Sequence, residues 1–159
     1  MLYIICAVLC GGLVALDQWV KWWTVANIPY CVPMEDPRPF IPYILGLNYT
    51  RNTGAAWSIL NQHTWILIAV SVVMVLVILA VIVFRFIRHP FGVIPLTFVL
   101  AGAIGNLIDR VRLGYVVDMF ETLFMDFPIF NVADICVVCG GIVFCVYYAF
   151  FADKWETKC

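Results

Sequence analysis

The chain has 159 residues, of which 65% are hydrophobic and only 12% charged, and its mean hydropathy is +1.02. About half of the residues in a soluble domain are apolar, so this composition excludes an ordinary soluble domain and indicates a membrane protein. The net charge is -1 and the pI is near 6.0, so no basic surface for nucleic acid is expected.

Four apolar segments predict membrane-spanning helices. The first, residues 2–22, is expected to be a retained span and not a cleaved leader, because no Lys or Arg precedes it and Leu9 stands where cleavage would need a small residue. Residues 64–84 carry no charge and are long enough to cross ~30 Å of hydrocarbon at ~1.5 Å per residue. The uncharged parts of residues 91–110 and 134–152 are shorter but sufficient.

An even number of spans places both termini on one side of the membrane. The turn with Arg85 and Arg88 is the densest basic cluster, and it predicts a cytoplasmic side together with the tail that carries Lys154 and Lys158. Of the nine basic residues, this orientation places four inside and five outside. The choice therefore rests on the density of the basic turn.

With that orientation, residues 23–62 and 112–131 face the exterior. The first segment contains several prolines and then YILGLNYTRNTGAAWSIL, whose β-type residues and glycines predict short strands of a small sheet at the membrane surface. The second is rich in aromatic residues and Met, which suits the membrane interface. No repeat or linker is found, so residues 1–159 are expected to form a single membrane domain.

The cysteines and histidines predict no metal, redox or cofactor site. The chain has seven Cys, and most of them fall inside apolar runs, where a thiol behaves as a small hydrophobic group. Cys136 and Cys139 have redox spacing, but they lie in a predicted membrane helix. No HExxH motif occurs, and His63 and His89 lie at the ends of segments.

Polar residues gather near the predicted outer ends of the spans, where they are costly and often functional. Asp17 and Lys21 are spaced i, i+4, so they form either an ordinary helix ion pair or part of a site. Asn52, next to Gly54, is either a turn residue or a site residue.

The third span ends with an amide, an acid and a guanidinium on one predicted helix face. Asn106, Asp109 and Arg110 have the spacing i, i+3, i+4. Ala101 and Gly105 are small residues four positions apart, which favours close helix packing. Packing accounts for the small residues but not for the three polar ones.

Asp118 and Asp134 are the central pair of acids. Asp118 is the one acid in YVVDMF, an apolar stretch of β-type residues, and Asp134 opens the fourth span. Asn131 and Asp134 also resemble the two ends of a helix capping box, so Asp134 alone has a structural explanation.

Two carboxylates held close together share one proton and titrate as a unit. The ionised member can take a proton from water while the protonated member donates to a carbonyl oxygen. Such a pair would hydrolyse a peptide without a metal or a covalent intermediate. Asp134, at a helix N-terminus, is the member expected to be ionised.

Five motifs occur in one order: DQWVK at 17–21, RNTGAAWS at 51–58, GAIGNLIDR at 102–110, GYVVDMF at 114–120 and FNVAD at 130–134. In this set the chain resembles the lipoprotein signal peptidases, also called signal peptidase II. The resemblance implies four membrane helices, an extracytoplasmic β-cradle, and a surface loop or short helix over the site. Asp126 is an additional acid near the site whose flanks match none of the family's motifs.

The resemblance also implies the activity: an intramembrane aspartyl endopeptidase that removes the signal peptide from bacterial prolipoproteins immediately before the diacylglyceryl-modified cysteine. Its catalytic residues would be Asp118 and Asp134. The residues that would bind substrate or support the site are Asp17, Lys21, Asn52, Gly54, Asn106, Asp109, Arg110 and Asn131.

The partners implied are diacylglyceryl-modified prolipoproteins and membrane lipids, with no cofactor, metal or nucleic acid. A monomer is expected in the bacterial cytoplasmic membrane, with both termini cytoplasmic and the site at the extracytoplasmic face.

Two other functions fit an apolar chain with a few acids. A small proton-coupled transporter would need polar stations at mid-depth and at both membrane faces, whereas the polar groups here gather at one face. A non-catalytic assembly factor would use the acids as interhelical contacts. It would tolerate Asp-to-Asn exchange at position 118 or 134, and a protease would not.

Overall fold

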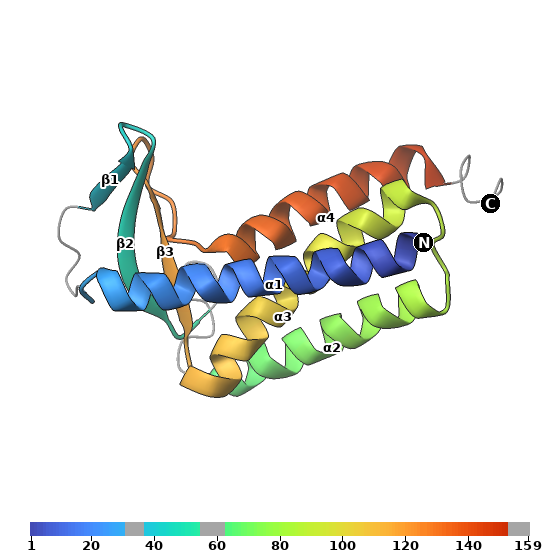
Figure 1. The fold of residues 1–159 in the computed structure, drawn as a ribbon, viewed down its shortest axis with the longest axis horizontal. Helices are drawn as coiled ribbons and strands as arrows, with labels where there is room; N and C mark the ends of the chain where they lie inside the picture. The colour runs from blue at the N-terminus through green and yellow to red at the C-terminus, as the bar shows by residue number, and fades with distance from the viewer. Residues whose placement is uncertain (31–36, 55–62, 153–159) are drawn as a thin grey trace.

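The computed structural model describes residues 1–30, 37–54 and 63–152. Four helices run side by side and a three-stranded sheet lies at one end of them (Figure 1). In chain order the elements are α1 (Leu2–Asn27), β1 (Arg38–Ile41), β2 (Leu45–Asn52), α2 (Thr64–Val83), α3 (Pro90–Leu113), β3 (Val116–Thr122) and α4 (Val132–Phe150).

All four helices are long and apolar enough to cross a membrane. The expected fold, four membrane helices with a small sheet, is thereby confirmed. Helix α1 continues to Asn27, beyond the predicted limit at residue 22, and α3 continues to Leu113. The N-terminus and the end of α4 lie at the end of the bundle away from the sheet (Figure 1).

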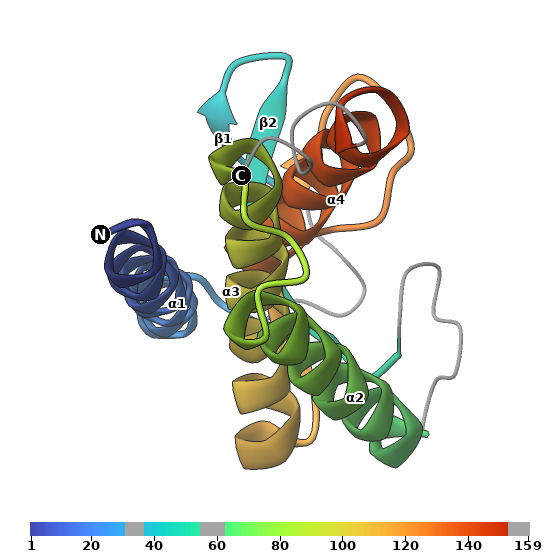
Figure 2. The ribbon, with the colours of Figure 1, turned by 90° about the vertical axis from the view of Figure 1, so that its right-hand side faces the viewer.

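Helix α3 is the central element of the bundle. Within an 18-residue apolar stretch of α3, 61% of the residues are buried. The corresponding share is 11% in α1, 11% in α2 and 22% in α4. The other helices lie around α3 (Figure 2) and turn apolar side chains outward, where lipid would surround them. A polar residue on the inner faces of α3 is therefore held among protein atoms.

Glycines allow α3 and α4 to approach closely. A Cβ atom at Gly102 of α3 would meet the carbonyl oxygen of Ala133 at the start of α4. One at Gly140 of α4 would lie 2.7 Å from the carbonyl oxygen of Pro95 on α3. The helix crossing thus depends on residues without side chains at these two positions.

Gly114 connects the end of α3 to β3. It has φ 80°, a left-handed conformation that glycine adopts without strain, and its N–H donates to the carbonyl oxygen of Arg110. The chain then reverses into β3, which brings position 118 back beside the last turns of α3. Strand bounds were predicted only in the first outer segment, and the β-type residues of YVVDMF prove to form the third strand.

The sheet is antiparallel with the order β1-β2-β3, and Thr50 of β2 pairs with Asp118 of β3. A buried cluster of Ile28, Tyr49, Val117 and Met119 joins the sheet to the end of α1. After β3, residues 123–129 form neither helix nor strand. Residues 55–62, which include the end of the RNTGAAWS motif, lie outside the described residues.

Candidate active site

Asp118 is the third residue of β3, and only 1% of its surface is exposed. Its two carboxylate oxygens accept hydrogen bonds from different amides. The Nδ2 atom of Asn52, the last residue of β2, lies 2.9 Å from Oδ2, and the Nδ2 atom of Asn131 lies 2.6 Å from Oδ1. A pair of strands and the entry to α4 thus fix the orientation of this carboxyl group.

Asp134 lies in the first turn of α4 and completes the capping box expected from the sequence. Its backbone N–H donates to the Asn131 side chain at 2.9 Å, and its Oδ2 accepts from the Asn131 backbone N–H at 3.1 Å. Its other oxygen accepts a hydrogen bond of 2.8 Å from Nδ2 of Asn106 on α3.

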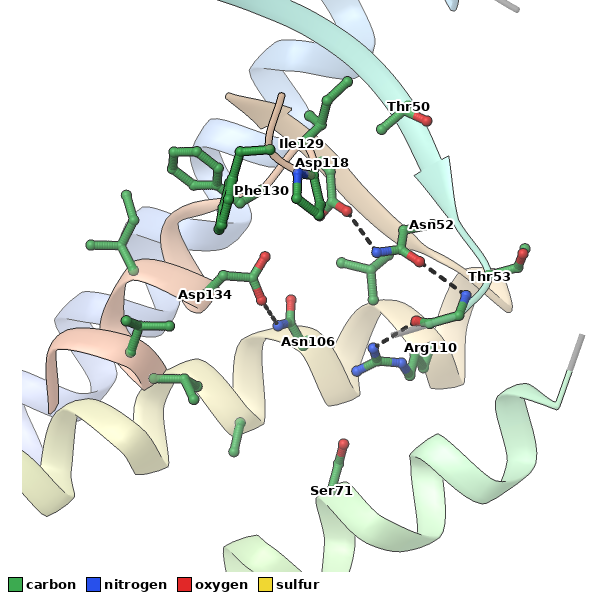
Figure 3. A pocket seen from close by; sticks show the side chains of 18 of the residues that line it. Thr50, Asn52, Thr53, Ser71, Asn106, Arg110, Asp118, Ile129, Phe130 and Asp134 are labelled. Atoms are coloured by element: carbon green, nitrogen blue, oxygen red, sulfur yellow. Dashed lines mark hydrogen bonds between the residues drawn. The ribbon is translucent and has the colours of Figure 1, made fainter. Parts of the chain in front are cut away.

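Asn131 connects the two acids. Its side chain is fully buried, caps α4 at Asp134 and donates to Asp118. Both aspartates border a single cavity of about 960 Å³ (Figure 3). Two acids far apart in the sequence are therefore held at one cavity by one amide.

The pKa of Asp118 is raised to about 7. Burial is the main cause, because it disfavours the charged form, and the negative charge of Asp134 adds to it. Hydrogen bonds from Asn52 and Asn131 and the charge of Lys21 act in the opposite direction. Asp118 therefore holds its proton to a much higher pH than an exposed carboxyl group would.

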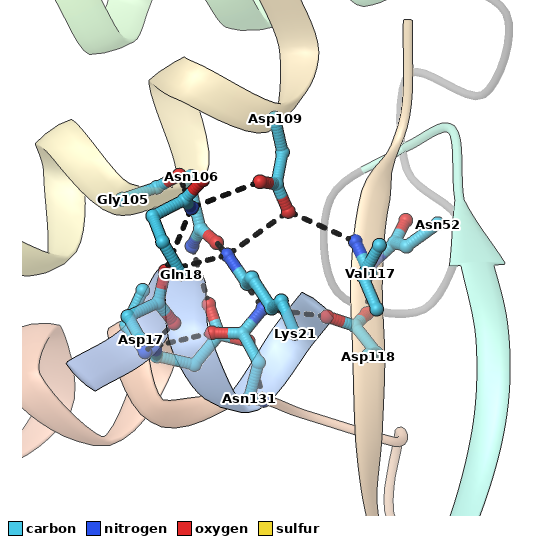
Figure 4. A network of polar contacts seen from close by, with 12 residues as sticks. Asp17, Gln18, Lys21, Asn52, Gly105, Asn106, Asp109, Val117, Asp118 and Asn131 are labelled. Atoms are coloured by element: carbon cyan, nitrogen blue, oxygen red, sulfur yellow. Dashed lines mark hydrogen bonds and ion pairs between the residues drawn. The ribbon is translucent and has the colours of Figure 1, made fainter. Parts of the chain in front are cut away.

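A buried polar network supports the acids from behind (Figure 4). At its centre the ammonium group of Lys21 lies 2.9 Å from Asp17, 3.0 Å from Asp109 and 3.0 Å from Oδ1 of Asn106. These contacts use all three donors of the ammonium group. The pair of Asp17 and Lys21 is thus a helix ion pair and, at the same time, part of the support of the site.

The acids of this network also accept hydrogen bonds from backbone N–H groups. Asp17 accepts a hydrogen bond of 2.9 Å from the backbone N–H of Ala133 in the first turn of α4. Asp109 accepts one of 3.1 Å from the backbone N–H of Val117, directly before Asp118. Each catalytic candidate is therefore next to a residue that is anchored to the network.

Gln18 belongs to this network and was not singled out from the sequence. Its side-chain amide donates to Asp109 at 3.0 Å, to Asp17 at 3.2 Å and to the carbonyl oxygen of Gly105 at 3.2 Å. An uncharged polar residue within an apolar span was the signal that could have indicated it.

Arg110 extends along the cavity from the last turns of α3. Its Nη2 atom lies 3.4 Å from the carbonyl oxygen of Gly54, a long contact. Its Nε atom is buried and has no hydrogen-bond partner within the described part of the chain. Because a buried guanidinium nitrogen without a partner is unfavourable, this atom is suited to meeting an acceptor that enters the cavity.

The predicted site residues fall into two groups. Those that border the cavity are Asn52, Gly54, Asn106, Arg110, Asp118 and Asp134. Asp17, Lys21, Asp109 and Asn131 lie behind them in the buried network. The shared face expected for the polar residues of α3 is therefore divided, since Asp109 turns towards α1.

The cavity continues from the polar residues into a mainly apolar part between α2 and α4. Met74 of α2, Ile135 and Val138 of α4 line it, and Ser71 of α2 contributes one hydroxyl. Phe127, from the segment after β3, lies at the cavity together with the exposed Asp126. Among the described residues, no group of three His, Cys, Asp or Glu side chains could hold a metal ion.

Together the fold and the site define a polytopic membrane protein with a pair of acids at one end of its helical bundle. Residues 9–151 match the family model Peptidase_A8, described as signal peptidase (SPase) II. The chain belongs to this peptidase family.

Relatives and solved structures agree with this family. The chain is 46% identical over 146 residues to the lipoprotein signal peptidase of Enterococcus faecalis, covering 92% of this chain and 87% of that protein. It is 42% identical to that of Lactococcus lactis subsp. cremoris, covering 92% of each. Two solved structures described as bacterial membrane enzymes share the fold, with TM-scores of 0.78 and 0.81, at 29% and 28% identity. They cover 96% and 92% of this chain, and 90% and 94% of theirs.

Proposed function

We propose that this protein is an aspartyl endopeptidase that removes the signal peptide from prolipoproteins, cutting immediately before the diacylglyceryl-modified cysteine. The proposal rests mainly on one observation: Asp118 and Asp134 both accept hydrogen bonds from Asn131 and border the same cavity. The names of the relatives support the substrate class, since they are lipoprotein signal peptidases.

In this proposal Asp118 holds the shared proton and Asp134 is ionised. The raised pKa of Asp118 supports its protonation. Asp134 lies at the N-terminus of α4, where the helix dipole and the hydrogen bonds from Asn106 and Asn131 favour a carboxylate. One group is then ready to accept a proton and the other to donate one.

The reaction proceeds by direct attack of water. Asp134 takes one proton from the water as its oxygen bonds to the scissile carbonyl carbon, and Asp118 donates its proton to the carbonyl oxygen. The tetrahedral intermediate then collapses. The C–N bond breaks, the leaving nitrogen receives the proton from Asp134, and a hydroxyl of the intermediate returns a proton to Asp118.

The remaining cavity residues are proposed to position the substrate. The unpaired Nε of Arg110 would donate to a peptide carbonyl or a lipid ester oxygen of the substrate. The apolar part between α2 and α4 would receive the lipid chains, because it continues from the acids along the two helices. A substrate anchored in the bilayer could then place its scissile bond at the edge of the membrane.

The site is proposed to lie at the extracytoplasmic face, with the N-terminus on the cytoplasmic side. Arg85 and Arg88 lie in the turn between α2 and α3, at the end of the bundle away from the sheet. By the positive-inside rule this end is cytoplasmic, and the sheet and the acids are then outside.

The test uses purified protein in detergent, a lipid-modified prolipoprotein and mass spectrometry of the products. Asp118→Asn and Asp134→Asn should each lower kcat by at least about 10³-fold, since each removes a proton-transfer group. Asp126→Asn is the matched control, because Asp126 lies at the same cavity but contributes no proton. The released protein should begin at the modified cysteine.

Retained cleavage in both Asn variants, with the helical content unchanged, would refute the aspartyl mechanism. If the wild type itself left the prolipoprotein intact, the acids would be interhelical contacts of an assembly factor, and the proposed activity would be wrong.

A further inference from the structure

A second cavity lies at the end of the bundle away from the sheet. Its volume is about 510 Å³, within the range of ~300–1,000 Å³ that is usual for small-molecule sites. It shares no lining residue with the cavity that contains the aspartates. Its walls come from three helices: Tyr3, Cys6, Ala7, Cys10 and Gly11 of α1, Leu79, Ile82 and Val83 of α2, and Thr97, Leu100 and Ile104 of α3, with Arg85 after α2.

The walls of this second cavity are apolar. Thr97 is the polar residue that α3 contributes, and its hydroxyl donates to the carbonyl oxygen of Val93 at 2.9 Å, within the same helix. Cys6 and Cys10 have free thiols, which behave as small hydrophobic groups. The body of the cavity therefore offers little to water or to a polar solute.

The length of the cavity matches one leaflet of a bilayer. Along α1 it extends from Tyr3 to Gly11, which corresponds to ~12 Å at ~1.5 Å per residue. Half of a ~30 Å hydrocarbon layer is ~15 Å. A lipid chain that enters from the end of the bundle would thus run along the cavity and stay within its own leaflet.

A cationic residue stands at the mouth of the cavity. Arg85 lies two residues after the end of α2, is exposed, and has its guanidinium carbon 5.2 Å from the centre of the Tyr3 ring. In the described part of the chain, the ion pairs are those of Lys21 with Asp17 and Asp109, so Arg85 has no carboxylate partner there. At the end of the bundle, Arg85 is placed where a lipid headgroup would lie. Its positive charge favours an anionic headgroup.

We propose that this cavity is a binding site for one anionic membrane phospholipid. One acyl chain fills the space between α1, α2 and α3, and the phosphate accepts hydrogen bonds from Arg85. The apolar walls select a chain, and the single cation at the mouth selects a negative headgroup. The site is independent of the proposed peptidase function, because the two cavities share no lining residue.

The experiment measures lipid retention by native mass spectrometry of the whole protein in detergent. Phosphatidylglycerol and phosphatidylcholine with identical chains are the two probes. The wild type should retain one phosphatidylglycerol in preference to phosphatidylcholine, and Arg85→Gln should lower this preference by about fivefold. Arg112→Gln is the control for charge removal, because Arg112 is exposed at the opposite end of the bundle.

A second pair of variants tests the cavity itself. A Cβ atom at Gly11 or at Gly12 would have no atom within 4 Å, so both positions accept a larger side chain, but only Gly11 lines the cavity. Gly11→Phe should abolish retention of phosphatidylglycerol, and Gly12→Phe should leave it unchanged. Circular dichroism checks that both variants fold.

The two lipid probes and the control variants also define the results that would overturn the proposal. Equal retention of phosphatidylglycerol and phosphatidylcholine by the wild type would show that the site does not select an anionic headgroup. Loss of phosphatidylglycerol in Arg112→Gln as large as in Arg85→Gln would indicate general charge attraction. Unchanged retention in folded Gly11→Phe would show that the chain binds elsewhere.

Discussion

Asn106 has a different contact at each end of its side-chain amide. Its Oδ1 accepts from Lys21 at 3.0 Å and from Asn131 at 3.1 Å, so the oxygen faces the buried network. The amide nitrogen must then point the other way, where it donates to Asp134. Lys21 therefore orients a donor at the acid without touching that acid, a positioning role that an ion pair alone would not suggest.

Burial of Asp118 has a consequence for stability that depends on pH. Its pKa is about 7 in the folded protein, against about 3.9 for an unperturbed Asp, so the folded state binds this proton more tightly than the unfolded state. Stability should therefore fall as the pH rises from about 4 to about 7 and then level off. The wild type and Asp118→Asn can be compared by thermal unfolding in detergent across this range.

In that comparison, the stability of Asp118→Asn should lack the fall between about pH 4 and about pH 7 that is due to Asp118, because an amide does not titrate. Asp126→Asn, which alters an exposed acid, is the control, and its stability should depend on pH as that of the wild type does. A wild-type stability that rises through the same interval relative to Asp118→Asn would contradict the assigned protonation.

The sequence placed most of the polar residues that meet at the site, but not the direction in which each side chain points. Asn106, Asp109 and Arg110 were expected to share one face. Successive residues turn by about 100° around a helix, so Asp109 and Arg110 lie on opposite sides of Asn106. Asp109 therefore reaches Lys21 on α1, and Arg110 reaches the cavity. Asn106, between them, contacts the buried network on one side and the cavity on the other.

At the level of elements, the crossing of α3 and α4 determines where the acids lie. Asn106 is on α3, Asp134 is on α4, and their 2.8 Å hydrogen bond needs a close approach of the two helices. Gly140 permits this approach, because a Cβ atom there would lie 2.7 Å from the Pro95 carbonyl oxygen and 2.8 Å from Cβ of Phe98.

Gly140→Leu should therefore push the helices apart and destabilise the fold by about 1–3 kcal/mol, the usual cost of overpacking. Gly141→Leu is the matched control, since a Cβ atom there has no neighbour within 4 Å. Both variants gain the same helix propensity, so the difference between their thermal unfolding midpoints in detergent isolates the helix contact. Equal midpoints would show that this contact does not determine the crossing.

The helices and the strands differed in how well the sequence predicted them. Long uncharged runs predict spans because only a closed set of backbone hydrogen bonds can cross lipid. For β3 the sequence indicated β-type residues in YVVDMF but no strand bounds, because the outer segment around it is rich in aromatics and Met and also suits the membrane interface. Its identity as a strand comes from pairing with β2, a contact between residues about seventy positions apart that no local pattern reveals.

At the scale of the whole molecule, the two ends of the bundle have different chemistry. The end with the sheet contains the buried network, both acids and the large cavity. The other end has the apolar cavity with Arg85 at its mouth. A chain with so few charged residues thus concentrates its buried polar residues at one end of the bundle, as the proposed cleavage of a lipid-anchored peptide requires.

The measurement that tests the central claim most directly is the pH dependence of kcat/KM for cleavage of a lipid-modified prolipoprotein. If Asp118 must hold a proton and Asp134 must be ionised, kcat/KM should fall on the alkaline side with an apparent pKa near 7, tenfold per pH unit. Asp126→Asn should give the same profile. A kcat/KM that stays constant from pH 6 to about pH 9 would contradict the account, because a pair that has lost its shared proton would still be catalysing.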